Sequence, residues 1–451
     1  MPGLFGLSVD PKEYSDDFLQ DLFWETFYQQ HLGEEYAGLA TYAGEEIKIR
    51  THRGLFRPTF SEDMAGLEGT EGIGYCGDNR EPVLVDSKLG EFAACFSGNL
   101  INRDDLVEEY KAAGQPFAWE GKCIEIIVKL IAQGDGLVDG IKRMTDKIEG
   151  AYSLLLLTHE GIYAACCPTG HWPLVIGEKK GAVAIASDPS GFHNCGFTPL
   201  RDLEPGEIVL LKNGRLETKE QMLTTRTQIC SFVWVYTNFP GAVFRNIPVT
   251  AVRKRLGAIL ARRDIEKGFI PDIVAPIPDS GRFCAIGYAQ EFVRQMNEGK
   301  VERAPQYDEV LLKYPYAGRS YIQLTQEKRE TYAHTKQLVS GEDYSGKVLV
   351  VCDDSIRRGT QTQRTTIPKI RNMGFTEIHL RVSNPDSLSY CPWGKSVKKG
   401  ELLAARIPDF KERAAFLGVD SAEHPTIEEL AEAIGLPVEM LCVDCDLPPS
   451  D

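Results

Sequence analysis

Apolar residues are arranged differently in the two halves of this chain, and the change falls near residue 228. Before it, short apolar runs are separated by Gly and Pro, as at 150–158, where a turn and a second run follow. Such runs predict a buried strand and a returning neighbour. Leu, Val and Ile recur three and four residues apart at 103–113 and at 123–133, which predicts two helices. The first half is therefore predicted to combine short strands with helices.

After residue 228, β-branched runs alternate with helical patterns. This alternation predicts a parallel sheet with helices on both faces. Strands are expected at 272–276, 347–354 and 377–383, and helices at 249–263 and 282–295.

A third segment begins near residue 406. It carries two helical patterns, at 409–418 and 426–435, and then a cysteine-rich end. We therefore predict three parts, 1–228, 229–405 and 406–451.

Composition narrows the possible partners. The net charge of −15 argues against nucleic acid, because neutralising phosphates requires clustered Lys and Arg. No apolar run approaches the roughly 20 residues that span a bilayer, so we expect no membrane segment and a cytoplasmic location. Most of the twelve cysteines stand alone in apolar sequence, which predicts small buried side chains and not disulfides.

Two adjacent carboxylates, Asp353 and Asp354, end the apolar run 347–352. Carboxylates at a strand tip can accept hydrogen bonds from the paired hydroxyls of a ribose. Gly359 and Thr360 follow, where backbone N–H groups at the start of a helix can surround a phosphate. Ribose and 5′-phosphate held in one loop describe a phosphoribosyl group. Arg357 and Arg358 add positive charge beside this predicted phosphate site.

Two other segments suit a diphosphate. Residues 276–282 form a predicted strand end that leads into a helix, where backbone N–H groups and the Arg282 guanidinium can hold pyrophosphate. Residues 313–323 form a basic and aromatic loop of the kind that closes over a charged substrate. Arg329 and Lys336 supply further cations.

Taken in order, these motifs resemble the glutamine PRPP amidotransferase family, whose substrate is 5-phosphoribosyl 1-pyrophosphate (PRPP). Segments 150–154, 173–177 and 204–208 resemble the glutaminase domain of that family. The resemblance implies an α+β N-terminal-nucleophile αββα sandwich, followed by an α/β type I phosphoribosyltransferase domain with a parallel sheet. It also implies transfer of the phosphoribosyl group to ammonia as in purine biosynthesis, with Mg²⁺, in a homo-oligomer.

The resemblance assigns roles residue by residue. Arg319, Asp353 and Asp354 are expected to be catalytic. The residues expected to bind PRPP are Asp279, Ser280, Gly281, Arg282, Lys313, Arg329, Lys336, Ser355, Arg358, Gly359, Thr360 and Thr362. Arg357 departs from the family, which has an apolar residue there.

The glutaminase half lacks the residues of its chemistry. Pro2 stands where the family has its nucleophilic cysteine, and proline offers no thiol. Ser97-Gly98-Asn99 replaces the Asn-Gly pair of the oxyanion hole, and the segment that clamps the glutamine carboxylate is shortened, leaving Arg80 near its place. We expect no glutaminase activity. The alternative is a relocated nucleophile, Cys76 or Cys95.

Four cysteines stand apart from the rest. Cys442 and Cys445 form a C-x-x-C pair, Cys391 precedes a proline, and Cys230 opens the second half. The family resemblance implies that these four hold a [4Fe–4S] cluster. The alternatives are a zinc ion on the same thiols and four cysteines that bind no metal. Zinc is an alternative because thiolates at this spacing suit either a cluster or a zinc ion.

The acceptor of the phosphoribosyl group stays open at this point. With the glutaminase disabled, ammonia is the first expectation, and a different amine or other nucleophile is the second. The non-enzymatic alternative is a PRPP or nucleotide sensor that regulates a true amidotransferase. A complete set of transferase motifs favours an enzyme.

Overall fold

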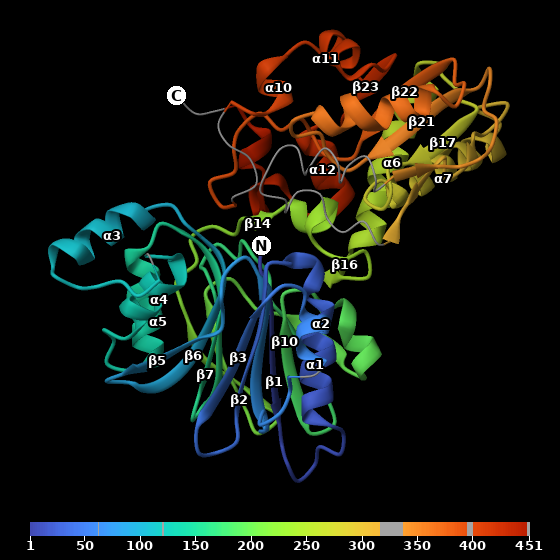
Figure 1. Ribbon diagram of the computed structural model, residues 1–451. Coiled ribbons are helices and arrows are strands. Elements are labelled where there is room, and N and C mark those ends of the chain that lie inside the picture. Colours follow the sequence, from blue (N-terminus) through green and yellow to red (C-terminus); the bar gives the residue numbers. More distant parts are fainter. Residues whose placement is uncertain (62, 120, 316–336, 395–399, 449–451) are drawn as a thin grey trace. The chain divides into compact units, whose positions relative to one another are not determined.

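The computed structural model describes residues 1–61, 63–119, 121–315, 337–394 and 400–448. The chain folds into two compact units (Figure 1). The first consists of Met1–Cys230 with Thr237–Asn246 and Pro392–Lys395, and the second of Ser231–Tyr236, Ile247–Cys391 and Ser396–Asp451. The segment from residue 406 onward is part of the second unit.

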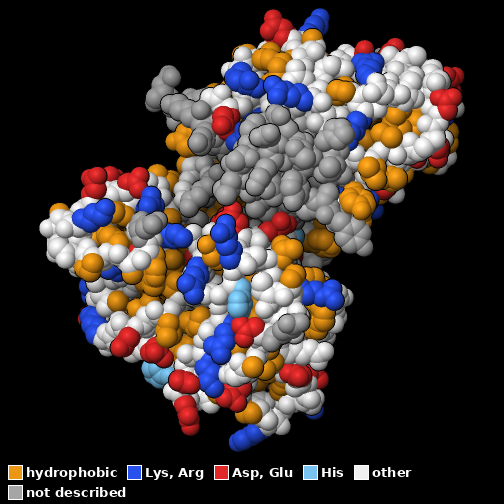
Figure 2. Space-filling model, viewed as in Figure 1, with side chains coloured by type: hydrophobic (Ala, Val, Ile, Leu, Met, Phe, Trp, Pro, Cys, Tyr) orange, Lys and Arg blue, Asp and Glu red, His pale blue; other side chains and the backbone are white. Residues whose placement is uncertain are grey.

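Acidic and basic side chains are interspersed over the visible face of both units (Figure 2). Among the described residues, no helix combines the length and the apolar character needed to cross a lipid bilayer.

The first unit is built on two antiparallel sheets. One has the strand order β11-β9-β10-β1-β4-β2-β3 and the other β13-β12-β8-β7-β6-β5. The first sheet comprises β1 (Gly3–Val9), β2 (Tyr36–Tyr42), β3 (Ile47–Arg53), β4 (Glu71–Gly77), β9 (Val175–Lys179), β10 (Ala182–Ala186) and β11 (Thr198–Asp202). The second comprises β5 (Val83–Ser87), β6 (Gly90–Leu100), β7 (Gly150–Thr158), β8 (Gly161–Cys166), β12 (Glu207–Lys212) and β13 (Arg215–Gln221).

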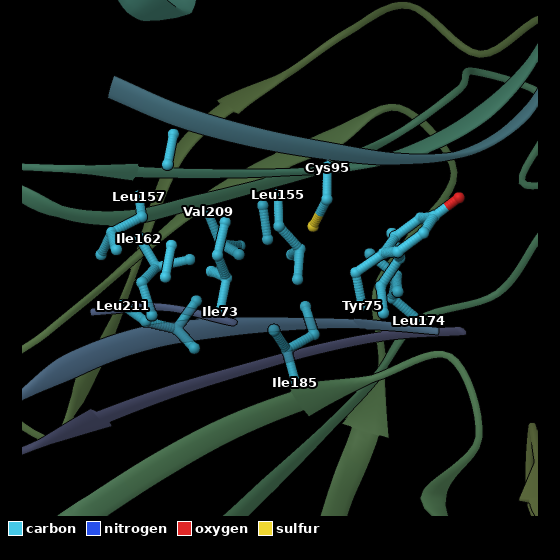
Figure 3. Close-up of a cluster of buried hydrophobic side chains, with 14 of the residues drawn as sticks. Ile73, Tyr75, Cys95, Leu155, Leu157, Ile162, Leu174, Ile185, Val209 and Leu211 are labelled. Atoms are coloured by element: carbon cyan, nitrogen blue, oxygen red, sulfur yellow. The ribbon is translucent and has the colours of Figure 1, made fainter. Parts of the chain in front are cut away.

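The core of this unit lies between the two sheets. Ile73 and Ile185 from the first sheet face Leu155 and Val209 from the second, and Cys95 lies among them (Figure 3). These side chains are fully buried. Each buried aliphatic side chain contributes roughly 1.5–3 kcal/mol, so this layer is the main source of the unit's stability.

Helices cover the outer faces of both sheets (Figure 1). The helix α1 (Phe18–Tyr28) packs on β1 and β4, and α4 (Cys123–Ile131) packs on β6. The remaining helices of this unit are α2 (Phe56–Phe60), α3 (Arg103–Ala112), α5 (Leu137–Lys147) and the short η1 (Gln30–Leu32) and η2 (Pro189–Cys195). Two sheets between two helical layers form the αββα sandwich that the family resemblance implies.

The second unit contains a five-stranded parallel sheet. Its strand order is β18-β17-β21-β22-β23. The strands are β17 (Ile273–Pro276), β18 (Gln306–Tyr307), β21 (Val348–Asp353), β22 (Glu377–Val382) and β23 (Ser421–Glu423). The three central strands lie within one residue of the predicted ranges at each end.

Helices cover both faces of the parallel sheet, as the βα alternation predicts. Val350 and Cys352 point to the face covered by α6 (Val249–Glu266) and α7 (Arg282–Asn297). Leu349 and Val351 point to the opposite face, because successive side chains of a strand alternate. That face is covered by α9 (Ile367–Arg371), α10 (Leu403–Arg406) and α11 (Phe410–Leu417).

Several short elements complete the chain. They are β14 (Ile229–Cys230), η3 (Val233–Thr237), β15 (Val243–Phe244), β16 (Ile247–Pro248), β19 (Leu311–Lys313), β20 (Gln337–Val339), η6 (Thr362–Thr366), α12 (Ile427–Ile434), η7 (Val438–Met440), β24 (Leu441–Cys442) and η8 (Asp444–Asp446).

Candidate functional site

The predicted site residues of the second unit gather where β17 and β21 end. These two strands are parallel neighbours, paired from Ile273 with Leu349 to Pro276 with Cys352. From β17 the chain moves to the edge strand β18, whereas from β21 it moves the other way, to β22. Open parallel sheets bind ligands beyond the carboxyl ends of the strands at such a reversal. The topology therefore selects the same two strand ends as the sequence motifs.

Asp353 and Asp354 lie side by side at the end of β21. The Asp354 N–H donates to Asp353 Oδ1 at 2.9 Å, and the Ser280 hydroxyl donates to the same oxygen at 3.3 Å. Ser355 Oγ donates to Asp354 Oδ2 at 2.7 Å. Burial, and secondarily the charge of Asp354, raises the pKa of Asp353 well above its ordinary value. A hydroxyl group that donates to this pair, or a positive charge beside it, would favour the ionised form of Asp353.

The turn after β17 lies directly against β21. Ile277 N–H donates to Cys352 O at 2.7 Å. A Cβ added at Gly281 would meet that same oxygen at 2.0 Å, so only glycine fits here. Ser280 is thereby brought to Asp353 although 73 positions separate them in the chain. Glycine at 281 is required by this close approach of two backbones.

Two of the expected pyrophosphate cations, Lys313 and Arg282, form ion pairs in this unit. Lys313 Nζ lies 2.5 Å from Asp279 Oδ2, and Arg282 Nη2 lies 3.3 Å from Asp279 Oδ1. Arg282 Nε also donates to Glu309 Oε1 at 2.9 Å. Each of these side chains is more than a third exposed, so the ion pairs between them are weak. A bound diphosphate can therefore replace the carboxylates as the partner of Lys313 and Arg282.

The segment after the carboxylates holds the expected phosphate ligands. Gly359 has φ +73°, and a Cβ there would meet Leu403 Cδ2 at 2.7 Å. Helical structure begins at Thr360 and includes Thr362 in η6. Arg358 Nε donates to Glu401 Oε2 at 2.8 Å. The glycine lets the backbone turn so that N–H groups at the helix start are open to an anion.

Arg357 does not add its charge to this phosphate loop. Its guanidinium carbon lies 4.4 Å from the centroid of the Phe232 ring, and its Nη2 lies 4.0 Å from Cys445 Sγ. The side chain therefore points toward the cysteines of the C-terminal segment, contrary to the expectation from sequence.

Three of the four singled-out cysteines belong to the second unit. Cys442 and Cys445 are buried and Cys391 is half-buried. Burial raises the pKa of Cys442 and of Cys445. Cys230 is joined to Ser231, whose N–H donates to Cys442 O at 3.2 Å.

Arg319, Arg329 and Lys336 lie outside the described residues. Lys313 is described in β19, at the start of the predicted closing loop.

Three residues that contact the predicted site residues carried no signal in the sequence. Glu309 pairs with Arg282, and Glu401 pairs with Arg358. Asn384, after β22, donates its N–H to Asp354 O at 2.9 Å. Each is an ordinary polar residue in its own segment, and only the fold brings it to the site.

In the first unit, the place of the expected nucleophile is occupied by Pro2. Ser97 Oγ donates to Pro2 O at 2.8 Å, so the residue that replaces the oxyanion-hole Asn binds the backbone instead. Asn99 Nδ2 donates to Pro392 O at 2.8 Å. Gly98 has φ +154°, and a Cβ there would lie 2.0 Å from Ala151 O.

The alternative nucleophiles lie in poor surroundings for a thiolate. Cys76 and Cys95 are fully buried, and burial raises the pKa of both thiols strongly. Cys95 is part of the apolar layer between the sheets (Figure 3). Arg80, near the place of the carboxylate clamp, donates from Nε to Thr51 Oγ1 at 2.9 Å.

Comparison with known proteins gives the same two-part picture. A family model described as a glutamine amidotransferase domain matches residues 76–194. The amidophosphoribosyltransferase of Methanothermobacter thermautotrophicus is 33% identical over 438 residues, which cover 94% of this chain and 89% of that protein. That of Methanocaldococcus jannaschii is 31% identical, with 99% and 96% covered.

Solved structures agree across both units. The structure of glutamine PRPP amidotransferase from Bacillus subtilis, complexed with ADP and GMP, is similar with a TM-score of 0.86 and 29% identity. The similarity covers 98% of this chain and 96% of that one. Both the N-terminal-nucleophile sandwich and the phosphoribosyltransferase domain are thereby confirmed. On this evidence the chain belongs to the amidophosphoribosyltransferase family.

Proposed function

We propose that this protein transfers the phosphoribosyl group of PRPP to ammonia, giving 5-phosphoribosylamine and pyrophosphate as in purine biosynthesis. In this proposal, residues 229–405 form the transferase domain, residues 1–228 a glutaminase-like domain and residues 406–451 a C-terminal tail. The observation that carries the proposal is the pair Asp353–Asp354 at the topological reversal of the sheet, beside Ser280 and the helix start at Thr360. One loop can there hold the ribose and the 5′-phosphate, with the 276–282 turn facing the diphosphate.

In the proposed step, the C1–N bond forms as the bond from C1 to the diphosphate oxygen breaks. The bonding electrons leave with pyrophosphate, and the ammonium product gives its extra proton to solvent. Positive charge develops on the ribose, which the ionised carboxylates of Asp353 and Asp354 stabilise. Mg²⁺ bound to the diphosphate would neutralise part of its charge, and Arg282, Lys313, Arg319, Arg329 and Lys336 provide cations for the leaving diphosphate. Ser355, Arg358, Gly359, Thr360 and Thr362 orient the 5′-phosphate.

The direct test is pyrophosphate release. Purified protein with PRPP, Mg²⁺ and ammonium chloride should release pyrophosphate at a rate that rises with the free ammonia concentration, and so with pH at constant total ammonium. Other amines should replace ammonia poorly. A faster reaction with a different amine would identify that amine as the acceptor. Tight PRPP binding without pyrophosphate release would favour the alternative of a PRPP sensor.

We further propose that the glutaminase-like domain hydrolyses no glutamine. Pro2 has no nucleophilic side chain, Ser97 is bound to the Pro2 carbonyl, and the buried Cys76 and Cys95 are held as neutral thiols. Attack on an amide requires a thiolate.

Glutamate release from glutamine should therefore stay at the level of a protein-free blank, with and without PRPP. The same preparation should still use ammonia. Glutamate release that disappears in a Cys76→Ala/Cys95→Ala double variant would show that one of these thiols had taken over the reaction.

The four cysteines are proposed to hold a [4Fe–4S] cluster. Among the described residues, no three His, Cys, Asp or Glu side chains converge closely enough for one metal ion. Zinc bound by the same thiols, at about 2.3 Å from each sulfur, is the alternative. A [4Fe–4S] cluster takes an all-thiolate ligand set, which Cys391, Cys442 and Cys445 with Cys230 would supply. When bound, the cluster supplies metal–sulfur bonds that fasten the C-terminal tail, with Cys230 as the fourth ligand.

We also propose a cytosolic homo-oligomer. No disulfide joins cysteines in the described ranges, and the cytosol keeps thiols reduced. The oligomeric state follows from the family resemblance.

A further inference from the structure

Arg282 is shared between two carboxylates at the turn that is expected to hold the diphosphate group of PRPP. Its Nε donates to Glu309 Oε1 at 2.9 Å and its Nη2 donates to Glu309 Oε2 at 3.4 Å. The same Nη2 lies 3.3 Å from Asp279 Oδ1, and Lys313 Nζ lies 2.5 Å from Asp279 Oδ2. Two cations and two carboxylates thus alternate along one series of contacts, and their formal charges sum to zero.

Glu309 reaches these contacts from a separate segment of the chain. The edge strand β18 pairs in parallel with β17, so that Tyr307 lies opposite Val274. The Asp308 N–H then donates to Val274 O at 3.1 Å, which extends the pairing to the residue before Glu309. The sheet therefore holds Glu309 at its carboxyl edge, beside the turn 276–282.

Tyr307 gives Glu309 a second hydrogen bond. Its hydroxyl donates at 3.2 Å to Glu309 Oε1, the oxygen that also accepts from Arg282 Nε. Burial, and after it the Glu309 carboxylate, raises the pKa of Tyr307 to about 12, so the hydroxyl remains a donor at neutral pH. Glu309 therefore keeps one hydrogen bond when Arg282 turns to another anion, which lowers the cost of the exchange.

A diphosphate that enters this site meets a guanidinium that already has an anionic partner. The side chains of Arg282 and Glu309 are 37% and 34% exposed, so water screens their ion pair and the pair can be broken. The carboxylate also repels the incoming anion, because both are negative and contact the same cation. Glu309 thus lowers the affinity for a diphosphate without closing the site to it.

We propose that Glu309 sets how tightly the site holds the diphosphate group, by competing with that group for Arg282. The carboxylate yields the guanidinium when PRPP binds and recovers it as pyrophosphate leaves, which favours release of the product. Glu309 acts in this way through Arg282. The inference rests on the proposed function, because it takes a diphosphate to lie at the turn 276–282.

The test measures the affinities of pyrophosphate and of PRPP by calorimetry, at a fixed free Mg²⁺ concentration and about 0.1 M salt. Glu309→Gln keeps the size of the side chain and removes its charge. Both ligands should bind to this variant about fivefold more tightly than to wild type, the upper end of what an exposed ion pair contributes. Raising the salt to about 1 M should reduce this ratio, because salt screens exposed charges. Glu309→Asp keeps the charge and should stay close to wild type.

Glu298→Gln is the matched control for the loss of one negative charge. Glu298 pairs with Arg294 and is 38% exposed, so the variant removes a carboxylate from a similar ion pair. Glu298 directly follows α7, and Arg282 begins that helix, which places the two residues about 24 Å apart. Charges at that separation are screened in about 0.1 M salt, so both ligands should bind as they do to wild type.

The sign of the change in affinity distinguishes two roles of Glu309. Tighter binding in Glu309→Gln, with wild-type affinity in Glu298→Gln, would support the competition. Weaker binding in Glu309→Gln would mean that the carboxylate holds Arg282 in place for the ligand, and it would refute the proposal. An unchanged affinity, or an equal gain in Glu298→Gln, would refute it as well. Protein that binds neither ligand in any of these forms would overturn the proposed function, and this inference with it.

Discussion

Replacing Asp353 or Asp354 by asparagine is expected to lower PRPP turnover about 100-fold or more, which corresponds to roughly 3 kcal/mol of transition-state stabilisation. The carboxylates interact most strongly when positive charge has developed on the ribose, so kcat should fall more than PRPP affinity. Asparagine is nearly isosteric and keeps the fold. Steady-state pyrophosphate release, with PRPP binding measured separately, gives both quantities.

Two comparisons show whether this loss is specific. Glu342→Gln removes an exposed carboxylate shortly before β21 and should leave turnover unchanged. Thr360→Val should mainly weaken PRPP binding, because the 5′-phosphate changes little between the ground and transition states. Equal losses of kcat in Glu342→Gln and Asp353→Asn would contradict the assigned role.

The same substitution has a predictable effect on stability. Burial and Asp354 raise the pKa of Asp353 above its unfolded value, so the folded protein binds this proton more tightly. Stability contributed by the protonated form is therefore lost as pH rises from the unfolded pKa through the folded one. Near neutral pH, Asp353→Asn should melt at least as high as wild type, as a thermal scan without ligand would show. A variant that is inactive and yet as stable as wild type would show that Asp353 serves catalysis and not folding.

Replacing Cys442 by serine is expected to abolish cluster binding and to lower the melting temperature. Anaerobically purified wild type should be brown, with about four irons and four labile sulfides per chain. The variant should be colourless, and its tail should unfold more readily, because metal binding and folding are coupled. Iron and sulfide analysis with thermal melting under nitrogen measures both effects.

Cys195→Ser is the matched control for the cluster. This thiol lies in η2 of the first unit, is half-buried, and should leave iron content unchanged. Wild-type protein that is colourless under nitrogen and carries one zinc per chain would replace the cluster by a zinc site.

The central strands and their helices were predictable because their signals are local. A run such as 348–353 is apolar on both faces, since helices cover both, and its carboxylate end marks where the strand leaves the apolar core. The edge strands β18 and β23 have two and three residues and were missed. The helix α5 was also missed, because its few apolar residues are separated by charged ones and by Gly140.

The predicted site also contains both residues that are neighbours in the chain and residues that only the fold brings together. Asp353, Asp354, Gly359 and Thr360 are neighbours in the chain, so the sequence could indicate the ribose and phosphate chemistry. Ser280 could be assigned to the same ligand only through the family resemblance, since it reaches Asp353 across the sheet.

By itself, the sequence determined the strand that ends in the two carboxylates and the glycine-containing turn after it, and it predicted a phosphate site in that turn and the loss of the glutaminase nucleophile. Each depends on residue type and short spacing, which folding does not alter. The tertiary structure alone decided that Glu309 and Glu401 pair with the expected substrate-binding arginines, and that Arg357 turns from the phosphate toward Cys445. The physical reason is that a guanidinium takes the partner that the fold places within reach, a carboxylate for Arg282 and Arg358 and an aromatic face for Arg357. That partner is set by contacts between segments as far apart as the 88 positions from Arg357 to Cys445.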